Sequence, residues 1–106
     1  MSTETPLHVQ TAAALGWTDL RIEQDRWWGV EPYGGLRMTV PCYDSSWCSS
    51  GPLSERFKIG VYWDHGTWVA SCVTDDGRDQ YAAGDRPTEA VSRMVVHLHK
   101  KGLLKL

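Results

Sequence analysis

The sequence predicts an α+β fold with an N-terminal helix, an antiparallel sheet of four to five strands, and a C-terminal helix packed on the sheet. Apolar and polar residues alternate through the middle of the chain, as in half-buried strands. Apolar residues recur with helical spacing near its end. The chain has 106 residues, of which 42% are hydrophobic and 23% charged, so we expect a single α+β domain over residues 1–106.

The N-terminal helix is predicted over residues 6–15. Thr5 has the chemistry of an N-cap, and Pro6 suits a first helical position because N–H groups there have no helical partner. Gly16 is a typical helix end. Residues 26–31 and 36–40 then predict a first hairpin around a Pro-Tyr-Gly-Gly turn.

Residues 42–55 contain five serines and, in the middle, Trp47. Loops of this length inside a compact domain are usually functional or hold a short helix. The run Ser49-Ser50-Gly51-Pro52 predicts that any helix here is no longer than a turn or two. We therefore expect a long loop over 42–55.

The strongest strand signal lies at residues 57–63, where apolar and polar side chains alternate. Tight turns at 64–66 and 75–77 predict a returning strand at 67–73 and a short edge strand at 78–83.

The C-terminal helix is predicted over residues 86–101, with Asp85 as the N-cap and Gly102 as the stop. Its apolar face consists of residues at i, i+3, i+4 and i+7, namely Val91, Met94, Val95 and Leu98.

Targeting signals and metal-binding patterns are missing from the sequence. No apolar stretch approaches the roughly 18–20 residues that span a bilayer, and the start lacks the basic and apolar parts of a signal peptide. We therefore expect a cytoplasmic protein without membrane contact. Cys42, Cys48 and Cys72 form an odd set that favours reduced thiols. The spacing of Cys42 and Cys48 differs from that of structural zinc sites, so we expect no metal and no cofactor.

Catalytic chemistry has one weak starting point, Asp44 beside Ser45 with His65 elsewhere in the chain. Adjacent serine and aspartate residues are typical of caps and turns. His97 and His99 point about 200° apart around a helix and cannot share a metal. The sequence therefore predicts no enzyme and no catalytic residue.

The six tryptophans are the compositional anomaly. Neighbouring strand residues face opposite sides, so Trp27 and Trp28 cannot both point inward. We expect Trp17, Trp63 and one of that pair in the core. The other member of the pair and Trp47 are candidates for exposure, as anchors for a partner or as stacking platforms, unless a helix or a dimer partner covers them.

The formal charge of −2, from 11 basic and 13 acidic residues, does not favour a basic nucleic-acid binder. Residues 93–106 nevertheless contain four basic residues and no acidic one. The element order is similar to that of double-stranded-RNA-binding domains. Those domains place lysines at the start of the last helix, where this chain has Asp85 and Glu89. Direct nucleic-acid binding is therefore not expected.

Five short segments occur in an order that matches a known family. They are Leu15-Gly16-Trp17, Trp27-Trp28, Val-Pro-Cys-Tyr-Asp-Ser at 40–45, Gly-Thr-Trp-Val-Ala at 66–70, and Ala-Ala-Gly-Asp-Arg-Pro-Thr-Glu-Ala at 82–90. Together they resemble the phage ABA sandwich domain, a family of small bacteriophage proteins without an assigned activity, over about residues 12–98. The family pattern has a helix after the tyrosine–serine segment, where this chain has Ser49-Ser50-Gly51-Pro52. The resemblance implies a phage origin and an α/β layered fold, and it carries over no catalytic residue.

These observations predict a small non-enzymatic phage protein of the host cytoplasm that acts by protein binding. Inhibition of a host defence complex of the CRISPR type is one such function. The acidic turn residues Asp75, Asp76 and Asp79 would face a basic channel, with Trp28 and Trp47 as anchors. A homodimer is the other partner expected from exposed apolar surface.

The alternative function is that of a small-molecule or nucleotide-binding module. It would use a tryptophan-lined pocket near the 42–55 loop, formed by Tyr43, Asp44, Ser45 and Trp47.

Overall fold

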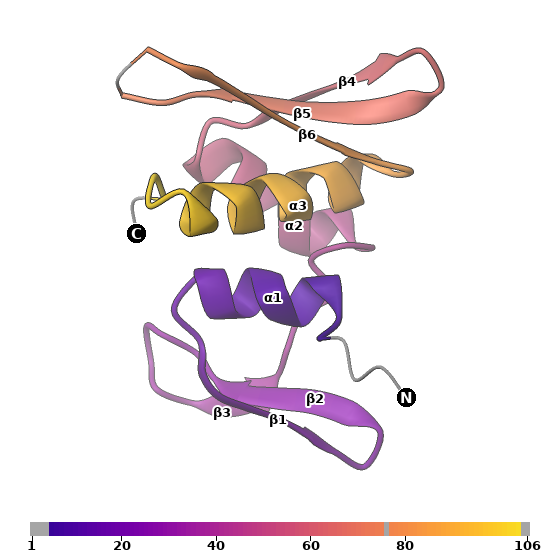
Figure 1. Cartoon of the computed structure of the whole chain (residues 1–106). Helices are drawn as coiled ribbons and strands as arrows, with labels where there is room; N and C mark the ends of the chain where they lie inside the picture. Colours follow the sequence, from indigo (N-terminus) through magenta and orange to yellow (C-terminus); the bar gives the residue numbers. More distant parts are fainter. Residues whose placement is uncertain (1–4, 76, 105–106) are drawn as a thin grey trace.

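The computed structural model describes residues 5–75 and 77–104. In this part of the chain a layer of helices lies between two antiparallel sheets (Figure 1). The helices are α1 (Leu7–Ala14), α2 (Trp47–Arg56) and α3 (Pro87–Lys100). Sheet A contains β1 (Thr18–Glu23), β2 (Arg26–Val30) and β3 (Arg37–Thr39). Sheet B contains β4 (Gly60–Asp64), β5 (Thr67–Val73) and β6 (Asp79–Gly84).

The α+β class is confirmed, but the prediction of one sheet with four to five strands is wrong. The strands form two three-stranded sheets in the orders β1-β2-β3 and β4-β5-β6. The segment between β3 and β4 includes α2 and carries the chain from one side of the helix layer to the other (Figure 1). The two hairpin regions therefore never meet edge to edge.

Strand β1 is absent from the sequence prediction because its side chains give little alternation. Most of them are exposed, and Leu20 is half-buried. The turn that follows is formed by Gln24 and Asp25, whose φ angles are 51° and 63°. These positive values fit the two-residue turn that joins twisted strands, although glycine or asparagine is the usual residue there.

Helix α2 corrects the prediction of a long loop over 42–55. Pro52 lies inside the helix and cannot donate a hydrogen bond to the carbonyl of Cys48. Both residues are exposed, so the break in the hydrogen-bond pattern lies on the solvent side of the helix. Gly51 leaves room for the Trp47 indole, since a Cβ there would lie 3.0 Å from Trp47 Nε1. Burial of Leu53 fixes the helix on the core.

The ends of α1 and α3 differ by one residue from the prediction. The N-caps are Pro6 and Arg86, without a side-chain cap, so the predicted caps Thr5 and Asp85 are wrong. Arg86 precedes a proline, which forces it into the extended conformation, with φ −134° and ψ 152°, that an N-cap has. Gly16 and Gly102 end their helices as predicted, with positive φ of 98° and 70°.

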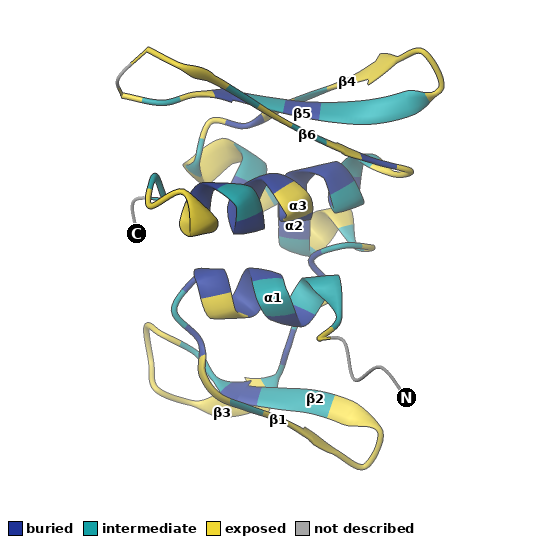
Figure 2. Cartoon of the chain, viewed as in Figure 1, coloured by how far each residue is buried: buried dark blue, intermediate teal, exposed yellow. Residues whose placement is uncertain are grey.

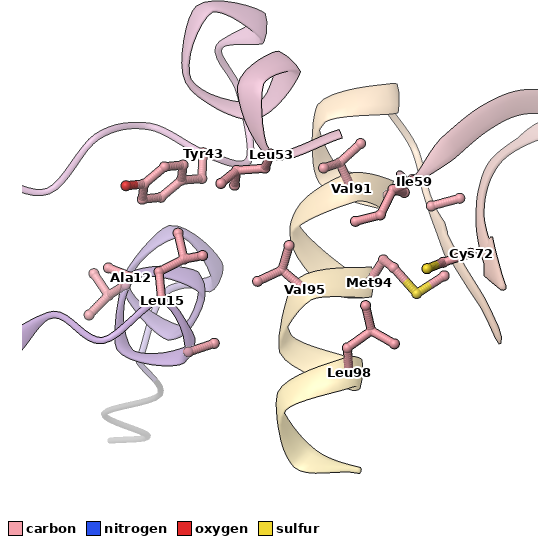
Figure 3. Packing of buried hydrophobic residues seen from close by; sticks show 14 of the residues in the cluster. Ala12, Leu15, Tyr43, Leu53, Ile59, Cys72, Val91, Met94, Val95 and Leu98 are labelled. Carbon is pink, nitrogen blue, oxygen red and sulfur yellow. The ribbon is translucent and has the colours of Figure 1, made fainter. Parts of the chain in front are cut away.

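The hydrophobic core is built around α3. Figure 3 shows Val95 directed toward Ala12 of α1 and Leu15, the residue that caps α1, whereas Met94 is directed toward Cys72 of sheet B. Helix α3 is therefore buried on more of its circumference than on the single apolar face that the sequence predicts, as Figure 2 shows. The further buried residues of this helix are Thr88, Ala90, Ser92 and Val96.

The tryptophans only partly follow the prediction. Trp17 is buried, and Trp27 packs against the core, as expected for one member of the adjacent pair. The prediction that Trp63 is a core residue is wrong, because 57% of it is exposed. Trp63 lies near the end of edge strand β4, where its ring makes an edge-to-face contact of 5.5 Å with Trp68.

Candidate partner-binding surface

The residues predicted to bind a partner lie on different parts of the molecule. Trp28 is half-buried on β2 of sheet A, and Trp47 is 50% exposed on α2. Asp75 and Asp79 belong to the β5–β6 turn and the start of β6, across the helix layer from Trp28 (Figure 1). Asp76 lies outside the described residues. The structure therefore does not bring the tryptophans and the acidic turn into one surface.

The residues predicted to bind a small molecule do not converge. Tyr43 is only 8% exposed and packs in the core (Figure 3). Burial raises the pKa of its hydroxyl, and a hydrogen bond from Trp17 partly opposes that shift. The Asp44 carbonyl accepts a hydrogen bond from Thr88, whereas Ser45 and Trp47 are exposed.

A pocket of about 400 Å³ lies elsewhere, between the end of α2, β5 and the C-terminal end of α3. Phe57, Cys72 and Leu98 contribute apolar walls, while Arg56 and Lys58 add positive charge. The Arg56 guanidinium already lies 5.0 Å from the Phe57 ring centre and 5.4 Å from that of Tyr33. This contact links the end of α2 to the β2–β3 turn.

Metal-binding groups do not gather in the described part of the chain. No three His, Cys, Asp or Glu side chains there lie together as a metal site requires. His65 is directed to its neighbour Asp64, with 2.5 Å between Nδ1 and Oδ1, at the exposed β4–β5 turn.

The outer face of sheet B is the side of the sheet that points away from the helices. Strand alternation places Val69 between Tyr62 and Ala83, and it places Ser71 next to Tyr81. Cys72 and Ala70 of the same central strand are buried against the helices, which fixes the direction of this face. The remaining members of the outer face are Gly60, Asp64, Thr67, Val73 and Asp79.

Aromatic and aliphatic side chains make up half of the residues of this face. Tyr62 is 44% exposed, Tyr81 is 56% exposed and Val73 is 66% exposed. Its two acidic residues, Asp64 and Asp79, lie at opposite ends of the strand ladders. The charge of Asp79 is the main cause of the raised pKa of the Tyr81 hydroxyl. The face therefore presents two exposed tyrosine rings between acidic ends.

The outer face of sheet A has a different character. Trp28 pairs there with Arg21 and Thr39. One ion pair lies within β1, from Asp19 to Arg21 at 2.7 Å, and another joins β1 to β3, from Asp19 to Arg37 at 2.9 Å. The hydrogen bond from Arg21 is the main reason that the pKa of Asp19 is lowered. These charges are already paired within the sheet, so this face offers a less open surface than that of sheet B.

The alternation of residues 60–64 and 67–73 is the sequence signal that could have indicated the outer face of sheet B. It does not show which side of each strand the helices cover, so Tyr62 and Tyr81 were not among the predicted site residues.

None of the helices in the described part of the chain combines the length and apolar character that a bilayer crossing demands. No protein-family model matches the sequence, and no curated protein sequence matches it either.

Proposed function

We propose that this chain is a non-enzymatic binding protein that recognises a partner protein through the outer face of sheet B. The exposure of Tyr62, Val73 and Tyr81 on one face, whose two acidic residues lie at its ends, supports this function best. Contiguous apolar patches with polar edges are typical of interaction sites. Tyrosine is also common in such interfaces, because it combines a large ring with a hydroxyl that bonds a partner.

The charges around this face favour a partner with basic residues outside an apolar centre. Asp64 and Asp79 mark two ends of the face, and the turn containing Asp75 adjoins the second end. Two stacked copies of the face would have acidic residues at the ends of both partners. A basic partner surface therefore gives better charge complementarity than a homodimer does.

The resemblance to a phage family suggests a specific form of this function. In it, the chain is a phage protein that occupies a basic, nucleic-acid-binding surface of a CRISPR-type defence complex in the host cytoplasm. The acidic residues near the β5–β6 turn, including Asp75 and Asp79, would face the basic channel. Tyr62 and Tyr81 replace Trp28 and Trp47 as the proposed anchors, because they share a sheet with the acidic turn.

The test of the binding function compares three tagged proteins in capture experiments from bacterial lysate. They are the wild type, the double variant Tyr62→Ala/Tyr81→Ala and the control Tyr33→Ala, which removes an exposed tyrosine of the β2–β3 turn. A stoichiometric partner should be retained by the wild type and the control, and its affinity for the double variant should fall at least ten-fold. Equal capture by all three folded proteins would contradict the proposed surface.

The defence-inhibitor form has its own test. The protein is added to purified CRISPR effector complexes, and the rate of target DNA cleavage is measured. Charge reversal at Asp75, Asp76 and Asp79 should weaken inhibition without lowering the melting temperature. Inhibition that survives this change would remove the acidic turn from the interface, and unimpaired cleavage in every effector would contradict this form of the function.

The alternative small-molecule function has less support, since Tyr43 is a core residue and Ser45 is exposed. A titration with a panel of nucleotides, followed by tryptophan fluorescence, tests it directly. A saturable change would favour the alternative, and a flat response across the panel would remove those nucleotides as ligands.

A further inference from the structure

A basic groove of about 460 Å³ lies between edge strand β6 and helices α3 and α1. Arg93, His97 and Lys100 of α3 contribute its charged or ionisable wall. The other lining residues are apolar and come from three elements, namely Leu7, Ala82, Ala83 and Val96. No acidic residue lines the groove among the residues described, although the chain as a whole carries a formal charge of −2.

The strand beside this groove has a neighbour on one side only, because sheet B ends with β6. The Thr74 N–H donates to the Arg78 carbonyl at 3.0 Å, which fixes the alternation of hydrogen-bonded pairs in the β5–β6 ladder. In an antiparallel ladder every second residue of a strand directs its backbone groups to the same side, so the residues that alternate with Arg78 turn to the other side. The N–H and C=O groups of Asp79, Tyr81 and Ala83 therefore point away from β5. Of these three residues Ala83 lines the groove, together with its neighbour Ala82, and the edge of β6 continues from there to Tyr81 and Asp79.

Helix α3 runs back along β6 after a short turn, so its basic residues are spaced along the length of the strand (Figure 1). His97 Nε2 lies 2.8 Å from Gln80 Oε1, which places the imidazole next to β6. Arg93 and His97 are four residues apart, a rise of about 6 Å along a helix. Alternate residues of a strand are about 6.7 Å apart. An extended segment beside β6 would therefore bring every second side chain near successive basic residues.

We propose that β6 accepts an extended acidic peptide of a partner as a fourth strand of sheet B. Backbone hydrogen bonds to Asp79, Tyr81 and Ala83 would hold the peptide, and its acidic side chains at alternate positions would contact Arg93 and Lys100. This interaction goes beyond the proposed function, since it uses the edge of the sheet and a ligand of opposite charge.

A peptide suits the groove better than a nucleic acid does. The edge of β6 offers both donors and acceptors, and a peptide backbone uses both, whereas phosphates accept only. Arg93 forms a 2.7 Å ion pair with Glu89 at i, i+4. The Arg93 side chain is 55% exposed and that of Glu89 only 18%, so an incoming carboxylate can reach the guanidinium from the solvent side while Glu89 keeps its bond.

The test uses a blocked octapeptide in which glutamate alternates with valine, titrated into the full ¹⁵N-labelled chain. The expected result is saturable shifts of the amides of Asp79, Tyr81 and Ala83, with slowed hydrogen exchange. The double variant Arg93→Gln/Lys100→Gln should bind at least ten-fold more weakly. The control Arg86→Gln/Lys101→Gln removes two exposed basic residues that do not line the groove and should bind as the wild type does.

Three other results would overturn the proposal. One is the absence of shifts along β6, and another is equal binding of a peptide with a central proline, which cannot complete the ladder. The third is tighter binding of a single-stranded oligonucleotide at the same basic residues. The amides of β6 report this interaction, whereas the Tyr62→Ala/Tyr81→Ala capture experiment reports the proposed function, so either can fail alone.

Discussion

The Thr88 hydroxyl donates a 2.8 Å hydrogen bond to the backbone carbonyl of Asp44. The bond joins the first turn of α3 to the segment that leads into α2. Thr88 is 6% exposed, so little water can replace the bond if it is lost.

Replacing this threonine should therefore destabilise the fold. In Thr88→Val the side chain keeps its shape and loses the donor, and the free energy of unfolding should fall by about 1–3 kcal/mol. Urea denaturation measures this change. Thr88→Ser keeps the hydroxyl and should lose less stability than Thr88→Val does. An unchanged Thr88→Val midpoint would show that the Asp44 carbonyl finds another partner.

Replacing Ser92 by alanine should stabilise the fold. Its Oγ is buried in α3 without a hydrogen-bond partner in the described structure. Ser92→Ala removes that desolvated hydroxyl and favours the helix, so the free energy of unfolding should rise by about 1 kcal/mol. The half-buried control Ser49→Ala of α2 should gain only helix propensity, about 0.5 kcal/mol. A destabilised Ser92→Ala protein in thermal denaturation would contradict the assignment.

The pH dependence of stability should include a contribution from Glu31. Its carboxylate accepts hydrogen bonds from the backbone N–H groups of Tyr33, at 3.0 Å, and Gly34. These bonds, that of Tyr33 foremost, lower the pKa of Glu31 below its ordinary value of 4.5. The stabilisation is therefore present above pH 4.5 and is lost as the pH falls through the folded pKa.

The variant Glu31→Gln should consequently show a flatter loss of stability on acidification, measured as urea midpoints from neutral pH downward. The exposed Glu55→Gln substitution in α2 is the matched control. Asp19 also has a lowered pKa, but it is present in all three proteins and does not affect their difference. Parallel curves for wild type and Glu31→Gln would refute this role.

Thiol reactivity should separate the cysteines into two classes. Cys42 and Cys48 are exposed, whereas Cys72 is buried, and burial raises the pKa of its thiol. The thiolate is the reactive form, so Cys72 should react slowly in the native protein. Ellman's reagent should titrate two fast thiols natively and all three in guanidinium. The variant Cys72→Ala should keep the full fast amplitude, and three equally fast native thiols would contradict the burial.

The helix over 86–101 and the strand over 67–73 could be predicted because their burial patterns are visible in the sequence. In the helix, Val91, Met94, Val95 and Leu98 recur on one face, and in the strand the buried residues alternate. Both elements pack on the core through these same side chains. Local pattern and tertiary packing therefore agree.

Helix α2 and strand β1 could not be predicted from their local residue preferences, because these preferences disagree with tertiary packing. Pro52 and Gly51 oppose a helix, and the core contact of Leu53 together with the solvent exposure of Pro52 overcomes them. In β1 most side chains face water, so hydrogen bonding to β2 is what defines the strand.

Only the acidic end of the outer face of sheet B could be recognised from the sequence. The acidic turn was recognised from its composition, and Asp79 does lie beside Tyr81 on the outer face of sheet B. The assignment of Tyr62 and Tyr81 to that face depends on where α3 packs, which no strand pattern specifies. The same applies to Trp63, whose alternation places it on the helix side although much of it is exposed.

Every ladder in the described sheets joins strands that are neighbours in the chain. Such hairpins close short loops, so their formation loses little chain entropy. The docking of α1 against α3, by contrast, closes a loop that contains most of the chain. Contact order therefore places the slow step of folding in the assembly of the helix layer. Changes such as Val95→Ala should slow folding, and changes on the outer strands should mainly speed unfolding.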